Sequence, residues 1–244
     1  MDKELSAINY FSENQDALME QYLNVLRIPS VSTDPAHKKD MERTAEFLKD
    51  YFEKLGMDYI EIFPTKVHPI VFAEKKSALP NAKTLLIYGH YDVQPPDPLH
   101  EWNTPPFEPN KVGDYIYARG ASDMKGQIMA SIFALESVLK TNDLPINVKF
   151  IIEGEEEIGS PSLVDFLEDH TELLKCDMIL NPDAGMISAT QPTIVYGLRG
   201  MVYIELRIDG PKMDLHSGLF GGNIANPANV IADIISKLHN PDGS

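Results

Sequence analysis

One ten-residue stretch constrains the fold of this chain more than any other: Thr84–Val93, which reads TLLIYGHYDV. Leu85–Tyr88 form an apolar run typical of a buried strand, and Gly89 closes it. His90 and Asp92 follow where the strand should end, and residues two apart in an extended backbone point to the same side. The stretch therefore predicts an imidazole beside a carboxylate at the carboxyl end of a central strand, where open α/β sheets place their ligands.

The pair His90 and Asp92 has two interpretations. A metal-bound histidine usually passes its second ring proton to a carboxylate or carbonyl, which fixes its tautomer, and Asp92 would suit that role. The alternative is an ordinary surface pair in a turn after a strand. This stretch alone leaves both interpretations open.

Strand-like and helix-like segments alternate along the first three quarters of the chain. The alternation predicts an α/β sheet with helices packed on it. Strands are expected at 58–63, 70–74, from residue 84, 115–119, 147–152 and 177–180, and helices at 18–26, 41–55, 128–139 and 162–169.

The pattern changes after Gly197. Residues 201–209 alternate like a strand exposed on one face, a glycine-rich turn follows, and residues 227–238 have helical spacing. We therefore expect two domains: residues 1–198, and the incomplete beginning of a smaller α+β domain at residues 199–244.

Composition excludes several classes of function. The formal net charge of −16 argues against binding to nucleic acid or to an anionic membrane. The single cysteine, Cys176, rules out an internal disulfide and favours a reducing compartment. The N-terminal residues do not resemble a signal peptide, and no apolar run approaches the ~20 residues that span a bilayer. The sequence thus predicts a soluble cytoplasmic protein.

Four segments that carry acidic residues or histidine each follow an expected strand. They contain His90, Asp123, the pair Glu156 and Glu157, and Asp183. Parallel strands bring their carboxyl ends to one edge of a sheet, so these segments should converge. Divalent cations relieve the repulsion of such a cluster, and its imidazole and carboxylate ligands suit zinc. Two zinc ions need a bridging ligand, for which Asp123 in its tight turn is the natural candidate.

The run Glu155–Glu157 follows the apolar strand VKFII directly. Charge runs are usually solvated helix surface, but this position favours a functional role. Adjacent Glu156 and Glu157 cannot point the same way, so one can bind a metal while the other accepts a proton from the attacking water. For Asp183 in NPDAG, turn chemistry is the alternative interpretation, and its three companion segments favour a ligand.

His216 lies in DLHSG, within the second expected domain. A lone histidine there is more often a surface or capping residue. The neighbouring Gly218, Gly221 and Gly222 permit close backbone approach, which favours a functional role modestly.

Taken together, these motifs resemble a family of zinc-dependent metallopeptidases. That family includes carnosinases, cytosolic non-specific dipeptidases, aminoacylase and the glutamate-releasing carboxypeptidases. The resemblance runs from about Leu18 to Gly222, and its motifs are GHYDVQP, RGASDMKG, EGEEEIGS, NPDAG, YGLRG and DLHSG. GHYDVQP and DLHSGLFGG are most similar to the dipeptidase and carnosinase branch.

The resemblance implies a set of metal ligands. His90 and Asp183 would bind one zinc, Asp123 would bridge, and Glu157 would bind the second zinc, with manganese or cobalt as other possible ions. It also implies a cis peptide bond after the bridging residue, between Asp123 and Met124.

The resemblance assigns the remaining roles as well. Glu156 would be the general base, Asp92 the partner of His90, and His216 a lid histidine that reaches the substrate carbonyl, often from the other subunit of a dimer. The implied fold is a three-layer α/β catalytic domain with a mixed, mostly parallel sheet, plus a smaller α+β lid that carries the homodimer contact.

The implied activity is di-zinc hydrolysis of the amide bond in dipeptides or similar small amides. Deacylation of N-acyl amino acids with the same metal core is a second possibility. The family takes a final histidine ligand from a C-terminal segment that this chain lacks, so we expect little activity from these 244 residues alone. A non-catalytic fragment that acts by binding or dimerisation is therefore a third possibility.

Overall fold

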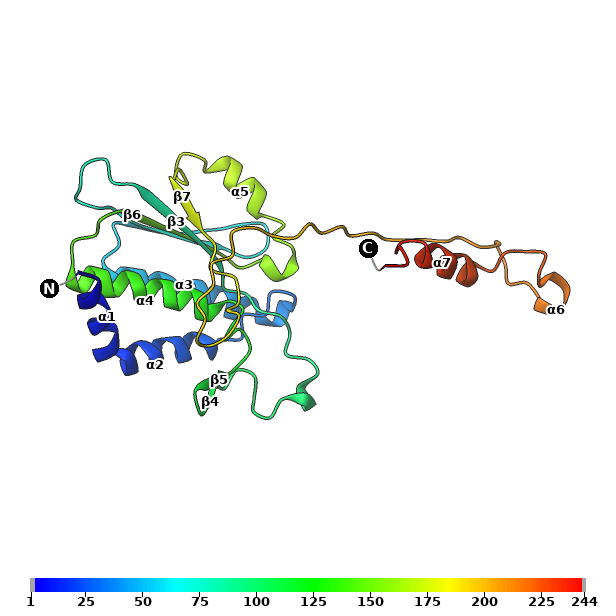
Figure 1. Cartoon of the computed structure of the whole chain (residues 1–244), viewed down its shortest axis with the longest axis horizontal. Helices are drawn as coiled ribbons and strands as arrows, with labels where there is room; N and C mark the ends of the chain where they lie inside the picture. The colour runs from blue at the N-terminus through cyan, green and yellow to red at the C-terminus, as the bar shows by residue number, and fades with distance from the viewer. Residues whose placement is uncertain (1–2, 243–244) are drawn as a thin grey trace. The chain divides into compact units, whose positions relative to one another are not determined.

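The computed structural model describes residues 3–242, which divide into two units between residues 193 and 194 (Figure 1). This division lies five residues before the boundary expected from the sequence, between 198 and 199. None of the described helices is both long and apolar enough to cross a membrane.

A five-stranded mixed sheet is the centre of the first unit, in the order β1-β2-β6-β3-β7. The mixed character is as expected, but the strand pairs are evenly divided: β3 is parallel to β6 and β7, while β2 is antiparallel to β1 and β6. The strands are β1 (Tyr59–Phe63), β2 (Ile70–Lys75), β3 (Thr84–His90), β6 (Asn147–Glu153) and β7 (Met178–Leu180).

Helices cover both faces of this sheet, which gives the three layers of an α/β fold (Figure 1). The apolar run of β6 explains why: Phe150 and Ile152 belong to the core cluster under α3 and α4, and Ile151 belongs to the cluster under α5. Strands buried on both faces read as continuous apolar runs. The helices of this unit are α1 (Lys3–Glu13), α2 (Gln15–Leu26), α3 (Lys38–Leu55), α4 (Lys125–Thr141) and α5 (Leu163–Asp169).

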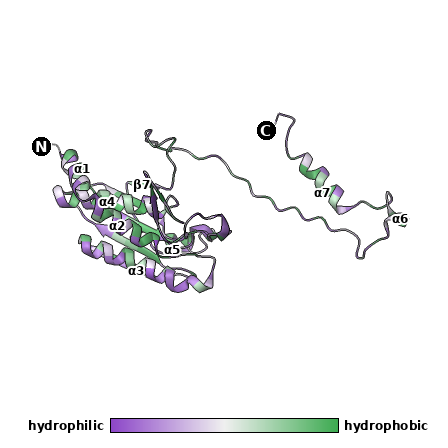
Figure 2. Cartoon of the chain, turned by 90° about the horizontal axis from the view of Figure 1, so that it is seen from below, coloured by the Kyte–Doolittle hydropathy of each residue, from purple (hydrophilic) through white to green (hydrophobic). Residues whose placement is uncertain are grey.

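In the helix α3, the helical spacing of apolar residues places them on the face that packs against the sheet. Met41, Ala45, Leu48 and Phe52 recur at helical spacing, and all four are buried against the sheet. In Figure 2 much of α3 is purple on its outward side, while green predominates where the helices meet the sheet. The helix ends at Gly56, whose left-handed backbone (φ +71°) is the usual conformation after a helix.

A long loop joins β3 to a small hairpin of β4 (Asn110–Val112) and β5 (Tyr115–Tyr117), with one turn of 3₁₀ helix at Leu99–Glu101. Trp102 anchors the loop, because its Nε1 donates to the Pro96 carbonyl at 2.7 Å and the Arg119 guanidinium lies 5.3 Å from its ring centre. The strand expected before Asp123 thus belongs to this hairpin and not to the central sheet. That part of the expected convergence was wrong, since an apolar run does not say which sheet it joins.

The described part of the second unit contains two short helices, α6 (Ser217–Phe220) and α7 (Pro227–Ser236). The strand expected at 201–209 was wrong: these residues form no strand. A strand needs a neighbour for its hydrogen bonds, and the described part of this unit offers no partner strand. The apolar side chains of α7 are likewise not buried.

Candidate metal centre

The strand β3 brings His90 to the carboxyl edge of the sheet. It pairs with β6 along seven residues, and His90 is level with Glu153 and completely buried. Gly89 is needed just before it, because a Cβ there would lie 2.8 Å from Cγ1 of Ile128 on α4. Helix α4 can therefore pack closely against the end of β3, next to the imidazole.

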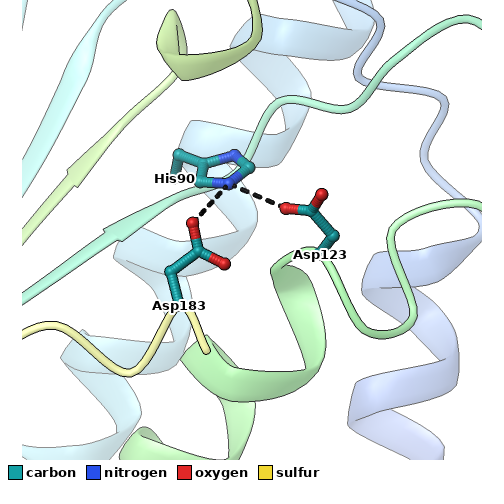
Figure 3. A group of neighbouring side chains, drawn as sticks. All are labelled: His90, Asp123 and Asp183. Atoms are coloured by element: carbon teal, nitrogen blue, oxygen red, sulfur yellow. Dashed lines mark hydrogen bonds and ion pairs between the residues drawn. The ribbon is translucent and has the colours of Figure 1, made fainter. Parts of the chain in front are cut away.

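Three of the four predicted metal ligands meet at this edge (Figure 3). Nε2 of His90 lies 3.1 Å from Oδ1 of Asp123 and 3.6 Å from Oδ2 of Asp183. The potential ligand atoms of the three residues lie within 4.8 Å of one another. Residues separated by up to 93 positions in sequence, 90 to 183, are thus side by side, with the histidine buried and the two carboxylates open to solvent.

Asp123 reaches this place through a turn before α4. The turn begins at Gly120 in a left-handed conformation (φ +78°), where the Lys125 amide donates to the Gly120 carbonyl at 3.1 Å. The buried ammonium of Lys125 donates to two carbonyls near the end of α2, at 2.7 Å and 3.1 Å. The Asp123–Met124 peptide bond is cis, which confirms the expectation from the family resemblance.

The three consecutive glutamates after β6 have three different environments. Glu155 is buried, and its carboxylate accepts from the amides of His68 and Ser162, both at 2.9 Å. Glu156 and Glu157 lie in one turn of 3₁₀ helix, Glu156–Ile158. Oε2 of Glu156 is 3.9 Å from Nε2 of His90, and both glutamates lie outside the tight group of three.

Asp92 is buried behind His90 and has more contacts than its predicted role requires. Its Oδ1 lies 3.3 Å from Nδ1 of His90, and the same ring nitrogen is 3.1 Å from the Asp92 carbonyl. The carboxylate also accepts from the amides of Glu156 at 3.2 Å and Glu157 at 3.1 Å. One carboxylate therefore orients both the imidazole and the turn that carries the two glutamates.

The electrostatics of the centre favour a cation. Burial alone would lower the pKa of His90, but Asp92, Glu156 and Asp183 together raise it to about 9. Burial raises the pKa of Glu156 and of Glu157, and neighbouring carboxylates raise both further. The carboxylates thus attract positive charge to one point, and imidazole with carboxylate oxygens is a donor set that suits a divalent ion.

His216 belongs to the second unit and is described there only. It precedes α6, and its Nδ1 accepts from the Gly218 amide at 3.1 Å. A neutral ring in this arrangement carries its proton on Nε2. Its predicted role as a lid histidine stays a prediction.

Sequence reasoning missed two features of the site. The first is the pair of hydrogen bonds that the Asp92 carboxylate accepts from the amides of Glu156 and Glu157. The second is the hydrogen bond between Gln94 and Glu157. Spacing cannot reveal contacts between loops that lie 63 to 65 residues apart in sequence. The only available signal was the place of Gln94 within the motif GHYDVQP.

Comparison with known proteins assigns the chain to a family. Residues 86–225 match Peptidase family M20/M25/M40, so the chain belongs to that family. The Cys-Gly metallodipeptidase dug1 of Schizosaccharomyces pombe is 33% identical over 95% of this chain and 51% of its own length. The Beta-Ala-His dipeptidase of Homo sapiens is 32% identical over 94% of this chain and 47% of its own length.

Solved structures agree with this assignment. The M20 family metallo-carboxypeptidase Sso-CP2 from Sulfolobus solfataricus has a TM-score of 0.79 and 43% identity, over 92% of this chain and 50% of that one. Human carnosine dipeptidase 1 has a TM-score of 0.75 and 28% identity, over 97% and 52%. The α/β fold is therefore confirmed, and the chain spans about half the length of each of these four proteins.

Proposed function

We propose that this chain carries the catalytic centre of a metal-dependent hydrolase that cleaves dipeptides. The observation that carries the proposal is the group His90, Asp123 and Asp183, whose potential ligand atoms lie within 4.8 Å of one another. The names of the relatives add the substrate class, since they include a Cys-Gly metallodipeptidase and a Beta-Ala-His dipeptidase. No specific observation favours the deacylase alternative.

The proposed ligands are His90, Asp123, Asp183 and Glu157. Zinc is the ion that we propose. Two ions would share Asp123 as a ligand, and manganese or cobalt would suit the same donors. When bound, such ions polarise a carbonyl and make water more acidic. The role of these side chains is to hold the ions and to place the scissile amide against them.

Glu156 is the proposed general base. Its carboxylate lies 3.9 Å from Nε2 of His90. Burial raises its pKa, which suits a group that takes a proton from the attacking water and returns it to the leaving amine. Asp92 supports it from behind by accepting from its amide at 3.2 Å.

We further propose that the second unit is the beginning of a lid. His216 would donate from Nε2 to the substrate carbonyl, since its Nδ1 already accepts from Gly218. We also propose that the protein forms a homodimer through residues 199–244 and that it is located in the cytoplasm. The single cysteine supports the reducing compartment.

The test uses the 244-residue chain with added zinc, alone and mixed with the C-terminal half of the Schizosaccharomyces pombe relative. We expect hydrolysis of Cys-Gly in the mixture and none when the chain carries Glu156→Gln. Metal content should stay the same in that variant. A preference for N-acetyl amino acids would instead indicate the deacylase, and zinc binding without any turnover in the mixture would favour the non-catalytic fragment.

A further inference from the structure

Gln94 is a polar residue at the metal centre to which the proposed mechanism gives no role. It is exposed and lies four residues after the end of β3 at His90. Its Nε2 donates to Oε2 of Glu157 at 2.8 Å and to the Glu157 carbonyl at 3.3 Å. Both acceptors belong to one residue, so the amide nitrogen joins the carboxylate of Glu157 to its own backbone.

The same segment also holds the other end of the Glu157 backbone. Oδ2 of Asp92 accepts from the Glu157 amide at 3.1 Å. Three atoms of Glu157, the amide nitrogen, the carbonyl oxygen and Oε2, are thus held by two residues that follow β3. The position of Glu157 is therefore tied directly to the segment that carries His90.

We propose that Gln94 is the positioning residue for Glu157: by holding Oε2 it sets the orientation of the carboxylate that would bind the metal. This inference rests on the proposed function, in which Glu157 is a ligand. Glu157 needs such help because it lies outside the tight group of His90, Asp123 and Asp183. Its carboxylate must approach the same ions as Asp123, although two carboxylates repel each other.

A neutral amide suits this task better than a charged group. Lysine or arginine would compete with the metal for the carboxylate, whereas the Gln94 amide orients it without adding positive charge. Partners of this kind fix the orientation of a ligand before the metal arrives, and their loss typically costs 10–100-fold in metal affinity. An exposed hydrogen bond between two loops could instead serve only to stabilise the fold, and the experiment must separate these two roles.

The experiment replaces Gln94 by methionine, which keeps the length of the side chain and removes its donors. Zinc affinity of the purified chain is measured by competition with a chromophoric chelator. We expect Gln94→Met to weaken the zinc site that Glu157 helps to form by about 10-fold. The matched control, Gln15→Met at an exposed glutamine of α2, should bind zinc as the wild type does.

A double-mutant cycle with Glu157→Ala identifies the route of the effect. If Gln94 acts through Glu157, the double variant binds zinc as weakly as Glu157→Ala alone. A full additional loss in the double variant, or wild-type affinity in Gln94→Met, would overturn the positioning role. Thermal unfolding without zinc provides the second readout, because a purely structural role would lower the melting temperature and leave the affinity unchanged.

The cycle also separates this inference from the proposed function. If Glu157→Ala binds zinc as tightly as the wild type, Glu157 is not a ligand, and both proposals fail at that residue. If Glu157→Ala loses affinity while Gln94→Met does not, the ligand role stands and only the inference about Gln94 is refuted.

Discussion

The two sides of the metal centre differ in how firmly the fold holds them. On one side, β3 and β6 pair along seven residues, and Asp92 behind them is completely buried. On the other side, β7 pairs with β3 along only three residues, and Met178, Ile179 and Leu180 are 42–68% exposed. A buried, hydrogen-bonded side fixes the imidazole and the two glutamates, whereas the side that carries Asp183 has little packing of its own.

Asp92→Ala, on the side formed by β3 and β6, is expected to lower the free energy of unfolding most. The change would leave the amides of Glu156 and Glu157 without their acceptor and would remove a partner of the His90 ring. A buried polar group left without a partner costs about 1–3 kcal/mol. Three groups lose a partner here, and two of them are the amides of half-buried residues, so we expect a loss of about 4 kcal/mol in the free energy of unfolding, together with loss of zinc binding. Urea unfolding measures the first quantity, and a loss below about 1 kcal/mol would contradict the comparison.

The second largest loss in the free energy of unfolding is expected within a matched pair of alanine substitutions. Leu86 and Ile179 are neighbours in register on adjacent strands, but Leu86 is 5% exposed and Ile179 is 68% exposed. Leu86→Ala should cost about 3 kcal/mol because it leaves a cavity, while Ile179→Ala should cost less than about 1 kcal/mol. Urea unfolding of the two variants side by side checks this, and equal losses would mean that β7 is packed as firmly as β3.

Gly154→Ala should have a smaller effect than Leu86→Ala. A Cβ at this position would lie 2.5 Å from the ring of Tyr91, which is completely buried. Overpacking of this kind costs about 1–3 kcal/mol, and we expect about 2 kcal/mol. Alanine at Gly185, where no atom lies within 4 Å of the place that the new methyl group would take, is the control and should unfold as the wild type does.

The smallest effect on stability is expected from Asp183→Asn on the open side. Without metal, the free energy of unfolding should change by less than about 0.5 kcal/mol, because Asp183 is exposed. Zinc at 100 times its dissociation constant should stabilise the wild type by about 2.7 kcal/mol, and the variant at the same zinc concentration much less. Thermal unfolding with and without zinc measures both, and full stabilisation of the variant would exclude Asp183 as a ligand.

Local pattern predicted those parts of the fold that depend on nearby residues. The spacing of Met41, Ala45, Leu48 and Phe52 gave α3, and the apolar run before His90 gave β3, because each periodicity reflects the element's own geometry. Pairing between strands is different. Residues 115–117 form a strand as expected, but their partner is another short strand and not the central sheet.

The candidate site shows the same limit. His90, Asp123 and Asp183 lie together as expected, although Asp123 arrives from a turn before α4 and not from the end of a central strand. The hydrogen bond that the buried Glu155 accepts from the His68 amide, and the one that Gln94 donates to Glu157, could not be predicted. Both depend on which loops meet in three dimensions, and no period in the sequence encodes that.

The anchored loop between β3 and the hairpin has a consequence for the chain entropy of metal binding. An ion that joins His90 to Asp123 closes a loop between residues that are 33 positions apart in the sequence. In a flexible chain such a closure opposes binding through lost conformational freedom, which grows with the logarithm of loop length. Here Trp102 already holds the loop through the Pro96 carbonyl and the Arg119 guanidinium. Folding has therefore closed most of this loop beforehand, and an arriving ion meets two ligands whose separation is already fixed.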